Sequence, residues 1–244
     1  MSQNIQDYYQ QATETPWGRL FYELVFHQLS IPPTSNVLDF GSGFGITASH
    51  YGNDTQLTAI EPNQDMLKLR MTGNYQQLTG GETLLKQLPE ESFDWIICHN
   101  VLEYTHHQEE LLSSLLSLLK PGGRLSLVKH HLSGGVIQQA VLMDQPQEAL
   151  AFLSHTDHSK ESYFGVIHFY EEKQLANWCL SNKAKIVERF GIRSLFGLSQ
   201  NHDIKHSPKW YQGMLALEKA IAQKEPFLEM AFYHHIIIEK HDNR

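Results

Sequence analysis

The sequence has few cysteines and no long apolar run. Of its 244 residues only Cys98 and Cys179 are cysteines, too few for the disulfide framework of a small secreted protein. No stretch approaches the roughly 18 consecutive apolar residues that a membrane span needs. The polar N-terminus also lacks the basic start and apolar run of a secretory signal. We therefore expect a cytoplasmic protein without a membrane segment.

An excess of positive charge is also missing. The formal net charge of −8 argues against a protein whose whole surface binds nucleic acid, but it leaves room for a local basic site. Fifteen histidines are present, several in adjacent pairs. Neighbours on a strand point to opposite faces, and no cysteine or carboxylate recurs at the spacing of a zinc site. We expect no metal.

From Asn36 onward the sequence alternates short β-rich runs with helical patterns, as expected for a parallel sheet built from βαβ units. Predicted strands cover residues 36–40, 56–60, 75–78, 93–99, 123–129, 185–190 and 229–239. Predicted helices cover residues 16–29, 45–51, 64–71, 108–119, 171–181 and 210–224. The fold class is therefore α/β, and the length suits one large domain.

The glycine-rich run Asp39-Phe40-Gly41-Ser42-Gly43-Phe44-Gly45 follows the apolar pair Val37-Leu38 and precedes a helix. Glycines permit a sharp turn between strand and helix and let the backbone approach a ligand closely. The spacing is G-x-G-x-G, which differs from the G-x-G-x-x-G that holds a dinucleotide pyrophosphate. S-adenosyl-L-methionine has no phosphate but carries an amino group that Asp39 suits, directly or through the loop.

Glu61 ends the second predicted strand, twenty-two residues after Asp39. Nucleotide-binding α/β folds place a carboxylate at about this distance, where it accepts hydrogen bonds from ribose hydroxyls. The glycine loop alone is as compatible with a simple packing turn as with a ligand site. Together with Glu61 it favours a nucleoside-bearing ligand.

Three further stretches resemble the class I, Rossmann-like methyltransferases that use S-adenosylmethionine. Residues 93–104 are similar to the family's fourth strand and the loop beside the reactive methyl group. The segment Leu119-Lys120-Pro121-Gly122-Gly123 is similar to the family's turn into strand five. Glu82 sits where the family has an acidic group near the adenine amine. The resemblance implies a doubly wound, mostly parallel seven-stranded sheet whose last strand is antiparallel, with a helical lid insertion.

Scattered pieces, including residues 99–104, Gly191-Ile192-Arg193 and Glu225-Pro226-Phe227, are similar to the methyltransferases that esterify 5-carboxymethoxyuridine at the tRNA wobble position. This resemblance implies that His99 lies near the cofactor, that Arg19 holds the methionine carboxylate and that Arg193 receives the substrate carboxylate. It is equally consistent with the sequence that Arg193 is a surface arginine without a functional role. The structural alternative for His99 is a hydrogen-bonded histidine that shapes its loop.

We predict a single domain, residues 1–244. It consists of an N-terminal helical cover (1–33), a cofactor-binding core (36–131), a lid insertion (132–165) and C-terminal helices and closing strands (166–244). The predicted catalytic residues are His99 and Arg193. The predicted cofactor-binding residues are Arg19, Asp39, Gly41, Ser42, Gly43, Gly45, Glu61, Pro62, Glu82, His99 and Asn100.

The expected reaction is methyl transfer from S-adenosyl-L-methionine to an oxygen or nitrogen nucleophile. A carboxylate acceptor needs alignment more than a base, whereas a hydroxyl or amine needs His99, His130 or His131 to take its proton. The acceptor is either a modified tRNA uridine or a small molecule, and no protein partner is predicted. A basic surface around Lys129, Lys183, Lys185, Arg189 and Arg193 would favour tRNA. A non-catalytic module that binds the cofactor is the third hypothesis.

Overall fold

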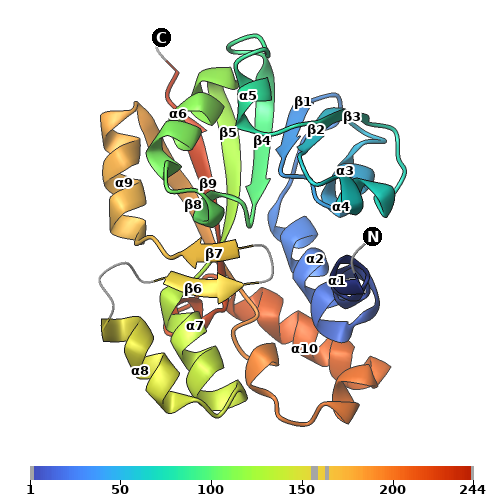
Figure 1. Cartoon of the computed structure of the whole chain (residues 1–244), viewed down its shortest axis with the longest axis vertical. Coiled ribbons are helices and arrows are strands. Elements are labelled where there is room, and N and C mark those ends of the chain that lie inside the picture. The colour runs from blue at the N-terminus through green and yellow to red at the C-terminus, as the bar shows by residue number, and fades with distance from the viewer. Residues whose placement is uncertain (1–2, 155–158, 163–164, 243–244) are drawn as a thin grey trace.

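The computed structural model describes residues 3–154, 159–162 and 165–242 of the chain (Figure 1). Within these residues seven strands form one sheet in the order β3-β2-β1-β4-β5-β9-β8. They are β1 (Asn36–Phe40), β2 (Gln56–Glu61), β3 (Gln76–Thr79), β4 (Phe93–His99), β5 (Leu119–His130), β8 (Ala184–Ile192) and β9 (Tyr233–Lys240). Strands β1 to β5 pair in parallel, and β9 is antiparallel to both β5 and β8. The predicted Rossmann-like sheet is confirmed.

Helices connect and cover these strands. They are α1 (Gln3–Glu14), α2 (Pro16–Gln28), α3 (Ile46–Tyr51), α4 (Gln64–Lys68), α5 (Glu82–Leu85), α6 (Gln108–Leu118), α7 (Leu132–Ile137), α8 (Pro146–Ser154), α9 (Glu172–Ser181), α10 (Pro208–Ile221) and α11 (Phe227–Met230). Short 3-10 turns are η1 (Leu102–Tyr104), η3 (Phe196–Leu198) and η4 (Asp203–His206), and η2 (Gln138–Leu142) is a π-helix. None of the described helices is long and apolar enough to cross a membrane.

The apolar side chains of β1 show how the sheet is buried on both faces. Leu38 and Phe40 join a core that includes the leucines of α6 and Trp178 of α9. Val37, which points the other way, packs in a second core with Tyr51 of α3. Because both faces are covered, the strand reads as a nearly unbroken apolar run, as central parallel strands do. Figure 1 shows α6 and α9 on one side of the sheet and α3 and α4 on the other.

Two strands, β5 and β9, begin four residues away from the predicted position. β5 begins at Leu119 instead of Gly123, because Leu119 still pairs with Phe93 before the register jumps to Trp95 and Arg124. The Pro-Gly-Gly segment therefore bulges out of one continuous strand, with Gly122 at a φ of +74°. β9 begins at Tyr233 instead of residue 229, because residues 227–230 form α11.

Sequence patterns missed α1 and a two-stranded hairpin. α1 is polar overall, but Ile5, Tyr8 and Ala12 lie at helical spacing on its buried face. The hairpin joins β6 (Ser159–Ser162) and β7 (Gly165–His168) in antiparallel register. It falls within or next to the predicted lid, whose other described parts are α7, η2 and α8. Residues 155–158 and 163–164 of the predicted lid, and residues 1–2 of the predicted cover, lie outside the described residues.

Candidate active site

A cavity of about 560 Å³ opens at the carboxyl ends of β1, β2 and β4, the edge at which open α/β sheets bind ligands. The helices α1 and α2 contribute to its wall through Tyr8, Trp17 and Phe21. Nine residues predicted from the sequence line it: Asp39, Gly41, Ser42, Gly43, Glu61, Pro62, Glu82, His99 and Asn100. The structure therefore brings most of the predicted cofactor residues into one place.

The glycine loop runs along the floor of this cavity in a left-handed conformation. Gly41 and Gly43 have φ angles of +75° and +55°, which side chains with a Cβ rarely adopt. The backbone N–H groups of Gly41 and Ser42 both donate to the carbonyl of Ile60 in β2, at 2.8 and 3.0 Å. These bonds hold the loop against the neighbouring strand and keep its backbone at the cavity surface.

Asp39 lies buried at the end of β1, with 3% of its surface exposed. Its Oδ2 atom is buried and has no hydrogen-bond partner among the described residues. Burial, with a smaller contribution from the nearby Glu61 carboxylate, raises the pKa of Asp39 to about 7. A buried acceptor without a donor is costly, so this carboxyl group is suited to a cationic donor in the cavity.

Glu61 holds the turn that follows β2. Its Oε2 accepts from the N–H of Gly43 at 2.8 Å, and its Oε1 accepts from the N–H of Asn63 at 2.7 Å. Burial raises the pKa of Glu61, although both N–H groups act in the opposite direction. Each carboxylate oxygen has a second lone pair, so the group is able to accept from a ligand diol while it braces the glycine loop.

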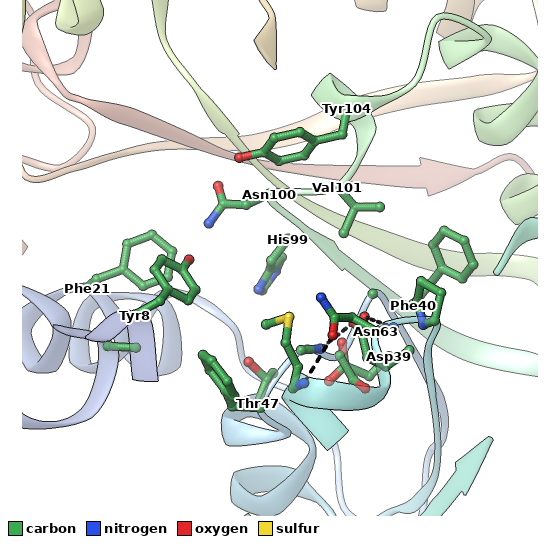
Figure 2. A pocket seen from close by; sticks show the side chains of 18 of the residues that line it. Tyr8, Phe21, Asp39, Phe40, Thr47, Asn63, His99, Asn100, Val101 and Tyr104 are labelled. Atoms are coloured by element: carbon green, nitrogen blue, oxygen red, sulfur yellow. Dashed lines mark hydrogen bonds between the residues drawn. The ribbon is translucent and has the colours of Figure 1, made fainter. Parts of the chain in front are cut away.

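His99 ends β4 and lines the cavity, with its Nε2 atom 2.8 Å from the hydroxyl of Ser126. Burial and the neighbouring His235 ring lower the pKa of His99 well below its ordinary value, so the ring is neutral. Asn100 follows at a φ of +53°, and its buried Oδ1 has no partner among the described residues. Figure 2 shows His99 surrounded by Tyr8 and Phe21, by Asp39 and Asn63, and by Tyr104.

Three predicted site residues do not line this cavity. Gly45, at a φ of +68°, caps α3 behind the loop. Arg19 is 55% exposed, lies over the ring of Tyr211 and is 3.9 Å from Glu23. Arg193 lies behind the wall, with its guanidinium 5.0 Å from the ring centre of Trp17 and 5.2 Å from that of Phe232. The ligand contacts predicted for these residues stay predictions.

Several aromatic side chains that the sequence pattern did not single out also line the wall. Tyr8 and Tyr22 come from the N-terminal helices, and Tyr233 comes from β9. His130 lines the same wall and faces the buried Glu103, whose Oε1 lies 2.7 Å from its Nδ1. Aromatic residues at helical spacing are indistinguishable from core residues in a sequence, so only the packing of α1 and α2 against the sheet reveals their place.

The histidine pairs do not form a metal centre. His131 stacks on His234 with ring centres 3.7 Å apart, and His106 lies 4.2 Å from His168. His234 faces Glu172 and the carbonyl of Leu228. No group of three or more His, Cys, Asp or Glu side chains in the described part of the chain could hold a metal ion.

Known proteins resemble this chain in sequence and in fold. A family model described as "Methyltransferase domain" matches residues 14–188. The tRNA 5-carboxymethoxyuridine methyltransferase of Escherichia coli K12 is 25% identical over 154 residues, which are 62% of this chain and 56% of the relative. This chain therefore matches little more than half the length of that relative.

Two solved structures share the fold. An S-adenosylmethionine dependent methyltransferase from Mesorhizobium loti has a TM-score of 0.59 at 14% identity, covering 91% of this chain and 98% of that one. The 1,6-didemethyltoxoflavin-N1-methyltransferase of Burkholderia thailandensis, with S-adenosylhomocysteine bound, has a TM-score of 0.53 at 15% identity, covering 95% and 81%. Since the family model matches well over half of the sequence, the chain belongs to the methyltransferase domain family, and the predicted Rossmann-like fold is confirmed.

Proposed function

We propose that this methyltransferase binds S-adenosylmethionine between Asp39, Glu61 and the glycine loop, and transfers its methyl group to a carboxylate. The observation that carries the acceptor class is the environment of Arg193. The carboxylate belongs either to a modified tRNA uridine or to a free small molecule.

The residues of the cavity fit the cofactor. The unpartnered Oδ2 of Asp39 matches a donor such as an ammonium group, and the free lone pairs of Glu61 match a ribose diol. The left-handed glycines leave the loop without side chains where the ligand passes. When bound, the cofactor supplies an electrophilic methyl group on a sulfonium. The described residues would contribute alignment and the exclusion of water.

Arg193 is a half-buried cation that forms no ion pair with a carboxylate among the described residues. Its Nε is buried and unpartnered, and its backbone has a φ of +63°. The acidic residue that acts on it, Glu218, already accepts from the N–H groups of Ser194, Leu195 and Phe196. Lys205 adds a second positive charge nearby. Because a buried charge without a counterion is costly, this corner favours an anionic ligand.

Tyr233 connects this charge to the cavity. Its side chain is hydrogen-bonded to Arg193, and it lines the cavity wall. Since a guanidinium only donates, the tyrosine oxygen accepts from Arg193 and keeps its own O–H to donate toward the cavity. Arg193 would thus orient an acceptor carboxylate through Tyr233. A carboxylate oxygen is already a nucleophile, so this reaction needs no general base.

Separate observations favour each source of the carboxylate. The Escherichia coli relative acts on a carboxymethoxyuridine of tRNA, as its name states. However, three of the five cations that were predicted to form a basic surface are paired or buried, whereas Lys183 is exposed. Lys185 pairs with Glu239 at 2.9 Å, Arg189 pairs with Glu172 at 2.7 Å, and Lys129 is 2% exposed. A small carboxylic acid is therefore the second candidate.

The test is to incubate the protein with methyl-labelled S-adenosylmethionine and either saponified total tRNA or a small-molecule extract. Mild alkali releases a methyl ester as methanol, whereas N-methyl and ether products keep the label. We expect alkali-labile label in one fraction, which then names the source. Alkali-stable label would contradict the carboxylate acceptor. Cofactor binding without label in either fraction would favour the non-catalytic module.

A variant assigns the role of Arg193. Arg193→Ala should raise the acceptor KM at least tenfold and leave the cofactor Kd within about twofold, because Tyr233 loses the charged hydrogen bond that orients it, which is worth roughly 1.5–3 kcal/mol. Arg70→Ala, outside the cavity wall, is the matched control and should change neither value. Loss of cofactor binding in Arg193→Ala would place this residue on the other ligand.

A further inference from the structure

A line of buried and half-buried polar side chains leads from His99 across β5 and β9, on one face of the sheet, to Gln28 of α2. His99 Nε2 lies 2.8 Å from Ser126 Oγ, which lies 2.8 Å from His235 Nε2. His235 Nδ1 lies 3.0 Å from Gln28 Oε1, and Gln28 Nε2 donates to the carbonyl of Gly191 at 3.2 Å. These residues come from α2, β4, β5 and β9 and are otherwise surrounded by apolar packing.

The carbonyl of Gly191 fixes the direction of every hydrogen bond in this line, because a carbonyl can only accept. Gln28 must therefore present its NH₂ group to Gly191 and its oxygen to His235. An amide oxygen also only accepts, so His235 carries a proton on Nδ1. The orientation of Gln28 thus determines the proton position on the ring next to it.

Both imidazoles are neutral, so the position of the proton on His235 also determines its position on His99. Burial lowers the pKa of His235 to about 3 and that of His99 well below its ordinary value. A neutral His235 with a proton on Nδ1 has a lone pair on Nε2, so the Ser126 hydroxyl donates to it. The serine oxygen is then the acceptor for His99, and His99 carries its proton on Nε2.

We infer that Gln28, His235 and Ser126 are positioning residues that fix the tautomer of His99, so that its Nδ1 lone pair faces the cavity as a hydrogen-bond acceptor for the cationic part of S-adenosylmethionine. The inference rests on the proposed cofactor site, but not on the identity of the methyl acceptor. We call Gln28, His235, Ser126 and His99 the tautomer relay.

The position of His99 fits this role. β4 pairs with β1 in parallel, with Ile97 opposite Asp39, so His99 and the unpartnered Asp39 carboxyl end on the same edge of neighbouring strands. S-adenosylmethionine carries two positive groups, an ammonium and a sulfonium. An Nδ1–H pointing into the cavity would oppose that charge, whereas a lone pair complements it. The tautomer relay would thus favour the sulfonium cofactor over its neutral thioether product.

The decisive variant is Gln28→Glu. The new carboxylate would draw a second proton onto His235, so that His235 Nε2 donates to Ser126 and Ser126 donates to His99 Nε2. His99 must then carry its proton on Nδ1. Nitrogen-15 NMR of histidine-labelled protein without cofactor distinguishes the protonated from the unprotonated ring nitrogen. We expect Nε2–H on His99 in the wild type and Nδ1–H in Gln28→Glu.

Cofactor binding supplies the second measurement. Gln28→Glu should raise the Kd for S-adenosylmethionine about tenfold and that for S-adenosylhomocysteine much less. Gln223→Glu is the matched control. Gln223 lines another cavity of the protein together with Gln28, but it is exposed and lies outside the tautomer relay. It should leave the His99 signal and both Kd values unchanged.

Ser126→Ala breaks the tautomer relay at its centre. In that background, adding Gln28→Glu should have no further effect on the His99 signal. A wild-type His99 with its proton on Nδ1 would overturn the inference, and this measurement needs no variant to fold. An unchanged His99 tautomer in folded Gln28→Glu would overturn it as well. Neither result would depend on whether the acceptor is a carboxylate.

Discussion

Asp39→Asn is expected to stabilise the fold of the free protein while it weakens cofactor binding. The pKa of Asp39 rises from its ordinary 3.8 to about 7, mainly through burial. Each pH unit between these two pKa values lowers the free energy of unfolding by about 1.4 kcal/mol, because the carboxyl group of the unfolded chain ionises at a lower pH. Above pH 7 the cost levels off at about 4 kcal/mol. Asparagine has the same shape and does not ionise.

The sign of the pH dependence makes this prediction specific. The folded state binds more protons than the unfolded state between pH 4 and pH 7, so wild-type stability attributable to Asp39 falls as the pH rises through that range. The gain from Asp39→Asn should therefore be small near pH 4, grow to pH 7 and remain level above. Urea denaturation without cofactor, repeated across this range, measures it.

Asp94→Asn is a matched control with the opposite sign. Hydrogen bonds from Lys120 and from the N–H of Asn36 hold the pKa of Asp94 below its ordinary value. Its carboxylate therefore stabilises the fold at neutral pH, and that contribution is lost as the pH falls through its folded pKa. Asp39→Asn should also raise the cofactor Kd by ten- to a hundredfold. A gain in stability that is independent of pH would refute the reasoning.

Two other substitutions test how the site is held. Gly43→Ala places a Cβ 3.0 Å from Met66 on a left-handed backbone, and should raise the cofactor Kd at least tenfold by calorimetry. Gly213→Ala, whose Cβ meets nothing within 4 Å and which lies outside the cavity wall, should leave the Kd unchanged. Equal affinities would contradict the close approach of the loop. Glu218→Gln removes one of two oxygens that hold three N–H groups after Arg193, and should lower the free energy of unfolding by about 2–3 kcal/mol. Wild-type stability in that variant would show that these bonds contribute little.

The sequence pattern could predict that the residues of the proposed cofactor site lie together, because their signals are local. Asp39, Gly41, Gly43 and Glu61 lie at the junctions of adjacent strands and turns, where residue type and spacing dictate conformation. The parallel sheet followed from the same alternation. What the sequence pattern could not supply was the partner of each polar side chain, since apolar periodicity records burial and not contact.

Other polar contacts join segments that lie far apart in the sequence. Gln28 meets His235 across 207 residues of sequence, and Tyr211 meets Glu23 across 188. Lys129 looked like a surface cation, but its ammonium donates to the carbonyl of Tyr170 in the interior at 2.8 Å, and burial lowers its pKa to about 8. No local pattern distinguishes such a buried lysine from an exposed one.

The position of β9 also constrains the order in which the protein can fold. β8 precedes β9 in the chain, yet within the described sheet it borders β9 alone, so its attachment to the parallel strands depends on the pairing of β9 with β5. Arg193 directly follows β8, and Tyr233 opens β9. The proposed cofactor site, built from strands close in sequence, can form early, whereas the proposed acceptor contact must await a long-range pairing that is slow to close. A chain caught between these stages would lack Tyr233 and His235 in their places, and with them both the proposed acceptor contact and the tautomer relay.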